Sequence, residues 1–497
     1  MARLFDPVTL DPSKMAMIED VLLIPLLNQT LLDIREGTNL VPGAAGEWST
    51  SPDKRVYTFR LRPGVRFSNG REVVAGDYVF ALERVLAPAT AAGMSSYFKG
   101  IRGAEGFVNG STNHVAGLSA PAADTLVIEL ERPDPTFGYL LVTQGVAVPP
   151  EEIDRLGPAF SLRPVGTGPY VVSEWKRGIR LRLARNPYYH GVEPQHFDGV
   201  DILIGGDEAT HLMMFERGEL DIANITLAGI PLPSFRRLSH DPRWCDLIES
   251  EQLFQTDFIS LNTEVPPLTN VLVRRAINHA INRDKWERVG TRYATHCEGV
   301  MPRIMPGFNP ALVGYEFNPD KARQLLRESG LPLPLHAVLW HGLDEPVRFL
   351  AQGVQADLKR VGVEVQLKPV TMAQLIEAMM VRREVPMGIS GWFAALPDGA
   401  DILGQQFDGR TVTNALTWNA SFYQNPEVDQ LLDEAAPEID LARRFETYQR
   451  AEQIIVRDAP CVFLGHQNKY ALRQRRLKGR LLEPLWIYRL DRVWIEE

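Results

Sequence analysis

Residues 335–393 alternate between strand and helix patterns, and this alternation constrains the fold more than any other feature of the chain. The expected order is strand, helix, strand, helix, strand, over residues 335–340, 347–358, 363–367, 372–380 and 387–392. The first helix ends at Gly362, a residue type that suits the end of a helix. Strands joined by helices at these lengths predict a parallel α/β unit.

Two aromatic segments end strands of this predicted unit. Trp340-His341 ends the first strand, and Gly391-Trp392-Phe393 ends the last. Ligands of open α/β sheets favour the carboxyl ends of the strands, so both segments are candidates for a binding site. The alternative interpretation is that these aromatic side chains close the hydrophobic core.

The first half of the chain is predicted to consist mainly of strands and turns, and helices become regular in the middle of the chain. Tyr57, Phe59 and Leu61 have the period of a half-buried strand, and after the Pro63-Gly64 turn Val65–Phe67 continues the pattern, which suggests a hairpin or small meander. Residues 273–281 carry apolar side chains on one helical face. Asn318-Pro319 and Asn425-Pro426 each combine an N-cap residue with proline at the first helical position, so both predict a helix start.

Length and charge exclude several classes of protein. A chain of 497 residues supports two to four domains. A net charge of −9 argues against a dedicated nucleic-acid binder, and no apolar run reaches the ~20 residues of a membrane span. The absence of a long linker favours two α/β lobes between which the chain crosses more than once.

Motifs for common chemistries are absent from the sequence. No P-loop, nucleophile elbow, C-x-x-C or H-E-x-x-H motif occurs. Gly166-Thr-Gly168-Pro-Tyr170 begins like a dinucleotide loop, but Pro169 removes an amide that a phosphate would need. Cys245, Cys297 and Cys461 are expected to be buried free thiols, although one disulfide is also compatible with their number. We therefore expect no catalytic residues, no metal and no cofactor.

Several segments together resemble the family 5 extracellular solute-binding proteins, the peptide- and nickel-type receptors of ABC importers. The resemblance runs from about residue 8 to the C-terminus and rests on Thr9–Pro12, Tyr57–Gly70, Val74–Val85, Pro164–Tyr170, Arg185–Tyr189, Leu261–Thr263, Val273–Asn278, Ile281–Arg283, Gly391-Trp392 and Pro426–Leu432.

The resemblance implies a two-lobed α/β fold of the class II periplasmic-binding-protein type, with an extra N-terminal sub-domain. Lobe one would comprise residues 1–258 and 465–497, with the sub-domain inserted at about 35–165, and lobe two would comprise 259–464. Hinge closure of the lobes would capture a small solute or oligopeptide and deliver it to the importer's permease. Such a receptor is expected to act as a monomer in the periplasm or another extracytoplasmic space.

The N-terminal residues lack the pattern of a secretory leader, so we expect a leader to be absent from this sequence. The alternative is a cytosolic sensor, since some transcription regulators carry a domain of this kind. An enzyme built on the same scaffold is a third interpretation.

Two charged anchors of the family are missing. In peptide-binding members an Asp follows Gly-Trp-x-Ala and pairs with the ligand's ammonium group, but here Ala395 follows Gly391–Ala394. An Arg that pairs with the carboxylate of dipeptides aligns with His341. Buried, unpaired peptide termini would be costly, which argues against short free peptides. Asp398 or Asp401 would be the substitute acid. Oligopeptides with other anchors, sugars, opines and metal chelates remain open.

The resemblance leads us to expect a ligand pocket drawn from many segments of the chain. Met94 and Tyr97 follow a loose match to a pocket aromatic, whereas the segment at 391–393 follows the family motif directly. Core or hinge packing is the alternative for each residue, and Trp418 and Tyr423 are assigned to structure. The complete expected set is Met94, Tyr97, Gln255, Asp257, Trp340, His341, Gly391, Trp392, Phe393 and Asp398.

Overall fold

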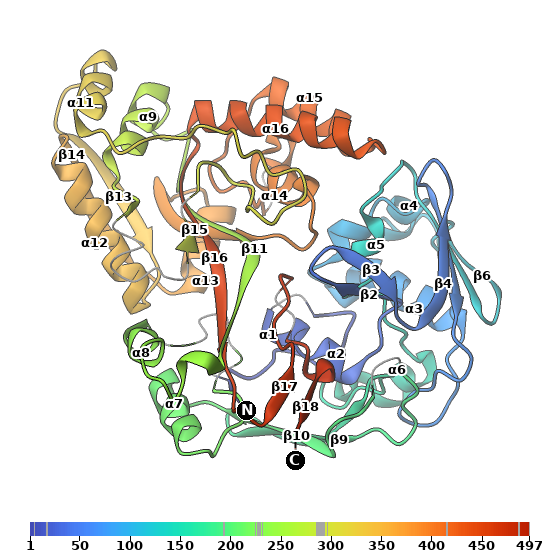
Figure 1. The fold of residues 1–497 in the computed structure, drawn as a ribbon. Helices are drawn as coiled ribbons and strands as arrows, with labels where there is room; N and C mark the ends of the chain where they lie inside the picture. Colours follow the sequence, from blue (N-terminus) through green and yellow to red (C-terminus); the bar gives the residue numbers. More distant parts are fainter. Residues whose placement is uncertain are drawn as a thin grey trace. The chain divides into compact units, whose positions relative to one another are not determined.

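The computed structural model divides the chain into two compact units. Unit 1 comprises Met1–Glu251 and Lys469–Glu497, and unit 2 comprises Gln252–Asn468. The chain leaves unit 1 within β11 (Ile248–Leu261) and returns within β16 (Cys461–Leu472), and these two strands lie side by side (green and red in Figure 1). The structure describes all residues except 4, 16–17, 192–193, 224, 226–229, 231, 285–293, 296, 414–415, 486–487 and 497.

The described residues of unit 1 form two four-stranded sheets and two strand pairs. The sheet orders are β1-β10-β9-β8 and β4-β5-β7-β6, and the pairs are β2-β3 and β17-β18. The strands are β1 (Ala2–Arg3), β2 (Leu32–Arg35), β3 (Asn39–Pro42), β4 (Ala45–Thr50), β5 (Val56–Leu61), β6 (Leu118–Ala122), β7 (Thr125–Glu129), β8 (Tyr170–Lys176), β9 (Arg180–Arg185), β10 (Gly199–Ile204), β17 (Leu477–Gly479) and β18 (Val493–Ile495). The α-helices are α1 (Ile18–Val21), α2 (Ile24–Leu27), α3 (Ala75–Leu86), α4 (Ala104–Val108), α5 (Phe137–Leu140), α6 (Pro150–Leu156), α7 (Glu208–Glu216) and α8 (Leu232–Leu238).

The N-terminal and C-terminal segments of the chain share one core in unit 1. Leu10 and Leu26 pack in the same buried cluster as Leu181, Leu482 and Val493. Distant parts of the sequence therefore depend on each other for burial of apolar surface.

The strand expected at Tyr57–Leu61 is confirmed as β5, but the predicted hairpin is wrong. β5 pairs with β4 and β7, both antiparallel. Val65–Phe67 forms no strand in the described chain, and only an isolated bridge joins Arg66 to Glu72. The partners of β5 are chosen by the sheet as a whole, which a local turn signal does not reveal.

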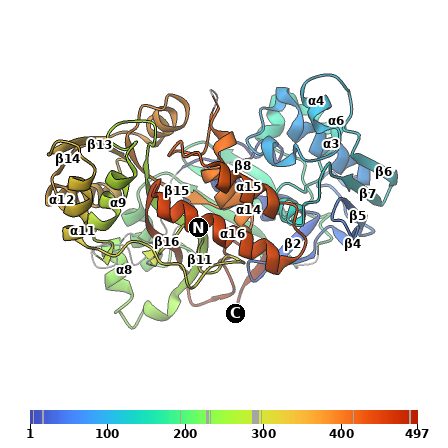
Figure 2. The same cartoon turned by 90° about the horizontal axis from the view of Figure 1, so that it is seen from above.

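Unit 2 is built on a mixed six-stranded sheet with the order β12-β16-β11-β15-β13-β14. Its remaining strands are β12 (Ala294–Thr295), β13 (Leu335–His341), β14 (Val363–Pro369) and β15 (Met387–Phe393). Its α-helices are α9 (Val271–Ala280), α11 (Pro319–Glu328), α12 (Glu345–Lys359), α13 (Met372–Ile376), α14 (Gly399–Phe407), α15 (Pro426–Ala435) and α16 (Leu441–Asp458). From above, α14, α15 and α16 lie together, and the C-terminal end of α16 contacts α9 (Figure 2).

The predicted parallel α/β unit is confirmed in residues 335–393. β13 runs parallel to both β14 and β15, while β15 runs antiparallel to β11. The second helix differs from the prediction, because α13 gives way at Glu377 to a π-helical turn that ends at Val381. The N-caps are confirmed: the side chains of Asn318 and Asn425 accept from the backbone N–H groups of Lys321 and Glu427, both at 3.0 Å.

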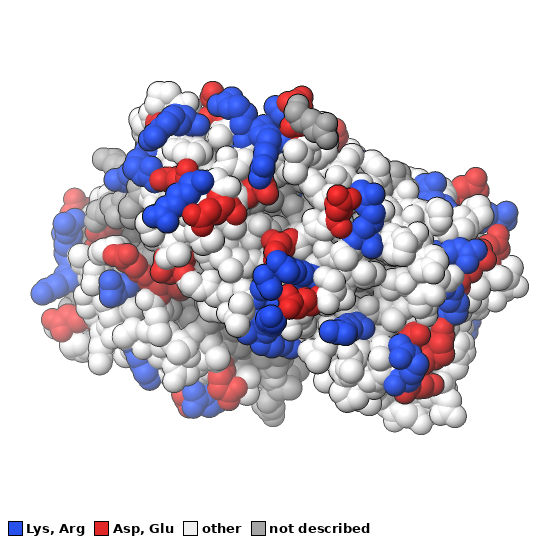
Figure 3. Space-filling view, turned by 90° about the horizontal axis from the view of Figure 1, so that it is seen from below, with Lys and Arg blue, Asp and Glu red and all other residues white. Residues whose placement is uncertain are grey.

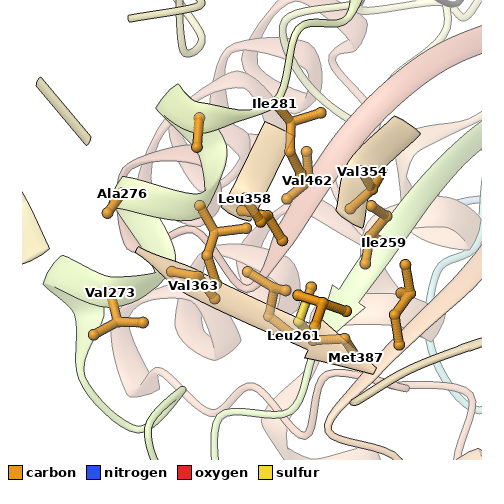
Figure 4. Packing of buried hydrophobic residues seen from close by; sticks show 14 of the residues in the cluster. Ile259, Leu261, Val273, Ala276, Ile281, Val354, Leu358, Val363, Met387 and Val462 are labelled. Carbon is orange, nitrogen blue, oxygen red and sulfur yellow. The ribbon is translucent and has the colours of Figure 1, made fainter. Parts of the chain in front are cut away.

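One core lies between this sheet and helices α9, α11 and α12. Ile259 and Leu261 of β11 and Met387 of β15 meet Val273 and Val354 from the helices (Figure 4). Side chains of a strand alternate between faces, so residues 255 and 257 of β11 lie on the same sheet face as Ile259.

The described chain has no helix with the length and apolarity of a membrane span, and no group of His, Cys, Asp and Glu arranged to hold a metal ion. All three cysteines are free, with Cys297 and Cys461 buried as expected and Cys245 only half-buried.

Candidate functional site

β15 has β11 on one side and β13 on the other, and it extends beyond the end of its pairing with β13. It pairs with β11 along its whole length, as far as Gln255 opposite Phe393. Its pairs with β13, in contrast, stop at Trp340 opposite Gly388. Within the described chain no strand pairs with Ile389–Phe393 on that side. The carboxyl end of β15 is therefore an open strand edge, which is able to bind an extended backbone.

A carboxylate lies across from this open segment. Asp257 of β11 is directly opposite Gly391 of β15. The side-chain amide of Gln255 donates to Asp257 Oδ1 at 2.8 Å, and the amide of Gln467 donates to Oδ2. Burial raises the pKa of the Asp257 carboxyl to about 6, while these two hydrogen bonds act in the opposite direction. The two amides thus fix the orientation of a partly buried acid.

Gly391 makes room for that acid. A Cβ atom at residue 391 would lie 2.6 Å from Asp257 Oδ1, closer than van der Waals contact allows. Any side chain here would displace the carboxylate. The glycine of the family motif therefore has a direct structural reason in this chain.

Trp392 and Phe393 lie on opposite faces of the sheet. Phe393 shares the face of Asp257 and Gln255, while Trp392 pairs with Thr256 on the other face. The Trp392 ring packs edge-on against Trp418, with ring centroids 5.5 Å apart. The Nε1–H group of Trp392 is buried and has no hydrogen-bond partner within the described residues, so it is a donor without an acceptor.

Asp398 does not take the place of the missing ligand anchor. Its carboxylate accepts two hydrogen bonds from Arg444, Nη2 to Oδ1 at 2.7 Å and Nε to Oδ2 at 3.0 Å. It also caps α14 by accepting from the backbone N–H of Ala400 at 2.8 Å. Asp398 is buried and Arg444 is fully buried. The expectation of a ligand-facing Asp398 is corrected, because both oxygens serve the internal structure.

Asp401 is also committed internally. It is buried, and its Oδ2 accepts from the backbone N–H of Ala395 and from that of Leu396 at 3.3 Å. Asp401 therefore holds the segment that follows β15 in place.

Trp340 and His341 are buried rather than exposed at the strand end. Trp340 packs in a cluster with Met379 and Ala420, and Lys368 Nζ lies 3.4 Å from the centroid of its ring. His341 Nδ1 is 2.7 Å from the carbonyl oxygen of Gly342. The structure thus favours the alternative interpretation, in which these two side chains close the core.

Met94 and Tyr97 belong to unit 1. Both are half-buried, and the Tyr97 N–H donates to the Met94 carbonyl oxygen at 3.2 Å in a short 3₁₀ turn. In unit 2 the structure brings together Gln255, Asp257 and Gly391 from the expected set, with Phe393 beside them. Sequence reasoning missed the contact of Gln467 with Asp257, because 210 residues separate them and no local pattern connects them.

Charged side chains of the described residues are spread over the face drawn in Figure 3. Lys and Arg side chains lie there beside Asp and Glu in small mixed groups. In one sheet of unit 1, Arg182 of β9 forms an ion pair with Asp201 of β10 at 3.0 Å.

Comparison with known proteins identifies the family. Residues 39–414 match the model of the bacterial extracellular solute-binding proteins, family 5. The chain therefore belongs to this family, whose members are solute receptors of ABC importers, and the resemblance drawn from the motifs is confirmed.

Similar proteins differ in what their names say they bind. Heme-binding protein A of Haemophilus influenzae is 27% identical over 91% of this chain and 84% of its own. The dipeptide-binding protein of Escherichia coli is 24% identical over 95% of this chain and 89% of its own. The solved structure of clavulanic acid biosynthesis oligopeptide binding protein 2 superposes with a TM-score of 0.91 at 25% identity, over 100% of this chain and 95% of that one. The two-lobed periplasmic peptide-receptor fold predicted for the chain is confirmed.

Proposed function

We propose that this receptor captures a peptide or peptide-like solute in extended form and passes it to the permease of an ABC importer. The open edge of β15 carries the proposal, because no described strand pairs with residues 389–392 on the side away from β11, which leaves room for an added strand. The names of two similar proteins, a dipeptide-binding and an oligopeptide-binding protein, support it. Haem, which the name of a third relative mentions, is the competing ligand.

The proposed ligand contacts are Gly391, Trp392 and Phe393 of β15 with Gln255 and Asp257 of β11. Met94 and Tyr97 are the proposed contribution of unit 1, through hinge closure of two lobes with boundaries near residues 258 and 465. Trp340, His341 and Asp398 are left out of this set because they are buried in internal contacts. The receptor acts outside the cytoplasm as a monomer and binds without chemical change.

A binding screen tests the proposal. A pooled library of tri- to pentapeptides, haemin and a panel of sugars are each added to the purified chain, and thermal unfolding is recorded. A ligand at 100 times its Kd stabilises the native state by about 2.7 kcal/mol, so a true ligand gives a clear shift. We expect stabilisation by peptides, with the bound species recovered intact by mass spectrometry. Stabilisation by haemin or sugars alone would refute a peptide receptor, and recovery of cleaved peptides would indicate an enzyme.

A matched pair of variants tests the site. Trp392→Ala removes the aromatic contact beside the open edge and should weaken peptide binding about tenfold or more. Trp494→Ala removes a 43% exposed tryptophan of β18 in unit 1 and should leave binding unchanged. Equal affinity of both variants would place the ligand elsewhere.

A further inference from the structure

The acids near the end of β15 differ in what they already bind. Asp398 is neutralised by Arg444, and Asp401 binds backbone N–H groups of the segment after the strand. Residue 395, where the resemblance predicts an anchoring acid, is alanine. Asp257 has two neutral amides as partners, and within the described chain no Lys, Arg or His forms an ion pair with it. Among the described residues, its charge therefore has no counter-charge.

The position of Asp257 gives a bound strand access to this charge. Gly391 is its neighbour on β15, and the space where a Cβ would stand is taken by Asp257 Oδ1. A ligand strand added to the open edge would lie about 4.8 Å beyond β15, and about 10 Å from β11. No side chain of residue 391 stands between them. A lysine or arginine side chain on the same face of the ligand strand, in an extended conformation, is long enough to reach the Asp257 carboxylate across β15.

We propose that Asp257 selects a ligand with a basic side chain at the ligand position that faces Gly391. This inference rests on the proposed peptide-binding function and adds the chemical class of the ligand. The acid comes from β11 and acts across a glycine, whereas the acid missing at residue 395 would follow β15.

The electrostatics of the site support this selection. Burial raises the pKa of the Asp257 carboxyl to about 6, and its two hydrogen-bond partners are neutral amides. At neutral pH the group is mainly an anion, and a ligand cation gains a charge-assisted hydrogen bond without breaking an internal ion pair. A neutral side chain at the same position would cover a charge and leave it unpaired, which is costly. Gln255 and Gln467 hold the carboxylate oriented before the ligand arrives.

The test uses defined pentapeptides as probes. In a penta-alanine series a single lysine is moved through positions one to five, and each peptide has a partner with norleucine in place of lysine. Calorimetry gives the Kd of every peptide for the wild-type chain. We expect the lysine peptide to bind roughly tenfold to a hundredfold more tightly than its norleucine partner at one position, the size of one hydrogen bond to a charged group.

Asp257→Asn keeps the side-chain shape and removes the charge. We expect this variant to reduce the lysine preference to about twofold or less. Asp440→Asn, an exposed acid of unit 2, is the matched control and should keep the full preference. Should Asp257→Asn not fold, Asp257→Ser provides the same comparison.

The outcomes separate the two proposals. If no peptide binds, the proposed function fails and this inference fails with it. If peptides bind but no position prefers lysine to norleucine, only the role of Asp257 is overturned. A lysine preference that persists in Asp257→Asn also overturns it.

Discussion

Asp398→Asn should destabilise unit 2 strongly, because it removes the counter-charge of a buried arginine. Arg444 has no exposed side-chain surface, and its guanidinium donates to both oxygens of the Asp398 carboxylate. Its other bonds go to backbone carbonyl oxygens of Ala435, Ala436 and Glu438. Asparagine is also a good N-cap residue, so α14 keeps its cap in this variant. The loss of unfolding free energy therefore reports on the ion pair with Arg444. Removing one partner of a buried pair costs about 3–5 kcal/mol.

The assay is urea unfolding followed by circular dichroism, with hydrogen exchange of residues 399–407 and 441–458 to locate the loss. Asp440→Asn is the control, since Asp440 caps α16 by accepting from the Arg443 N–H at 3.0 Å but is exposed. It should change the free energy of unfolding by about 0.5 kcal/mol or less. The structural assignment of Asp398 is refuted if the two variants are equally stable while Asp398→Asn alone loses peptide affinity.

Two further predictions concern a buried acid and a glycine. Burial raises the pKa of Glu452, whose Oε1 accepts from the Met301 N–H at 2.8 Å, to about 7, above the ordinary value of about 4.3. Its contribution to stability is therefore complete below about pH 4.3 and is lost as the pH rises through 7. The free energy of unfolding should fall less between pH 5 and 8 in Glu452→Gln than in the wild-type chain. Glu446 is exposed, so Glu446→Gln should keep the wild-type pH dependence. The prediction is contradicted if the unfolding free energies of both variants depend on pH in the same way. Gly168→Ala should lower the free energy of unfolding by about 1–3 kcal/mol, because its Cβ would lie 2.3 Å from backbone atoms of Leu27 and Asn28 at the end of α2. Gly76→Ala is the control in α3. Its Cβ would meet nothing within 4 Å, so this variant should raise the free energy of unfolding by about 0.5–1 kcal/mol. Urea unfolding of both glycine variants tests this prediction. If Gly168→Ala is as stable as the wild-type chain, the backbone around Gly168 can shift to accept a Cβ and the prediction is wrong.

Local signals in the sequence predicted much of unit 2. The periodicity of residues 335–393 gave strands and helices in the observed order, and the capping asparagines Asn318 and Asn425 marked two helix starts. These signals act within one turn or one strand, so neighbouring residues contain all the information. Periodicity did not predict the π-helical turn at Glu377–Val381. Such a turn differs from an α-helix only in that each hydrogen bond spans one residue more, and this leaves no clear trace in the residue pattern.

The motif at Gly391-Trp392-Phe393 identified the family and one strand of the candidate site, and Asp257 was also expected there. The state of each side chain could not be predicted in the same way. Trp340 ends a strand as expected, yet its ring is buried beside Met379. Strand periodicity alone does not show which face a later segment will cover.

The sequence by itself determined the class of protein, the α/β unit of residues 335–393 and the absence of an acid at residue 395. Only the tertiary structure decided which acid is available to a ligand. Asp398 is paired with Arg444, 46 residues away, and Asp257 with Gln467, 210 residues away. Contacts over such separations depend on how strands and helices pack together, which residue patterns along the chain do not encode.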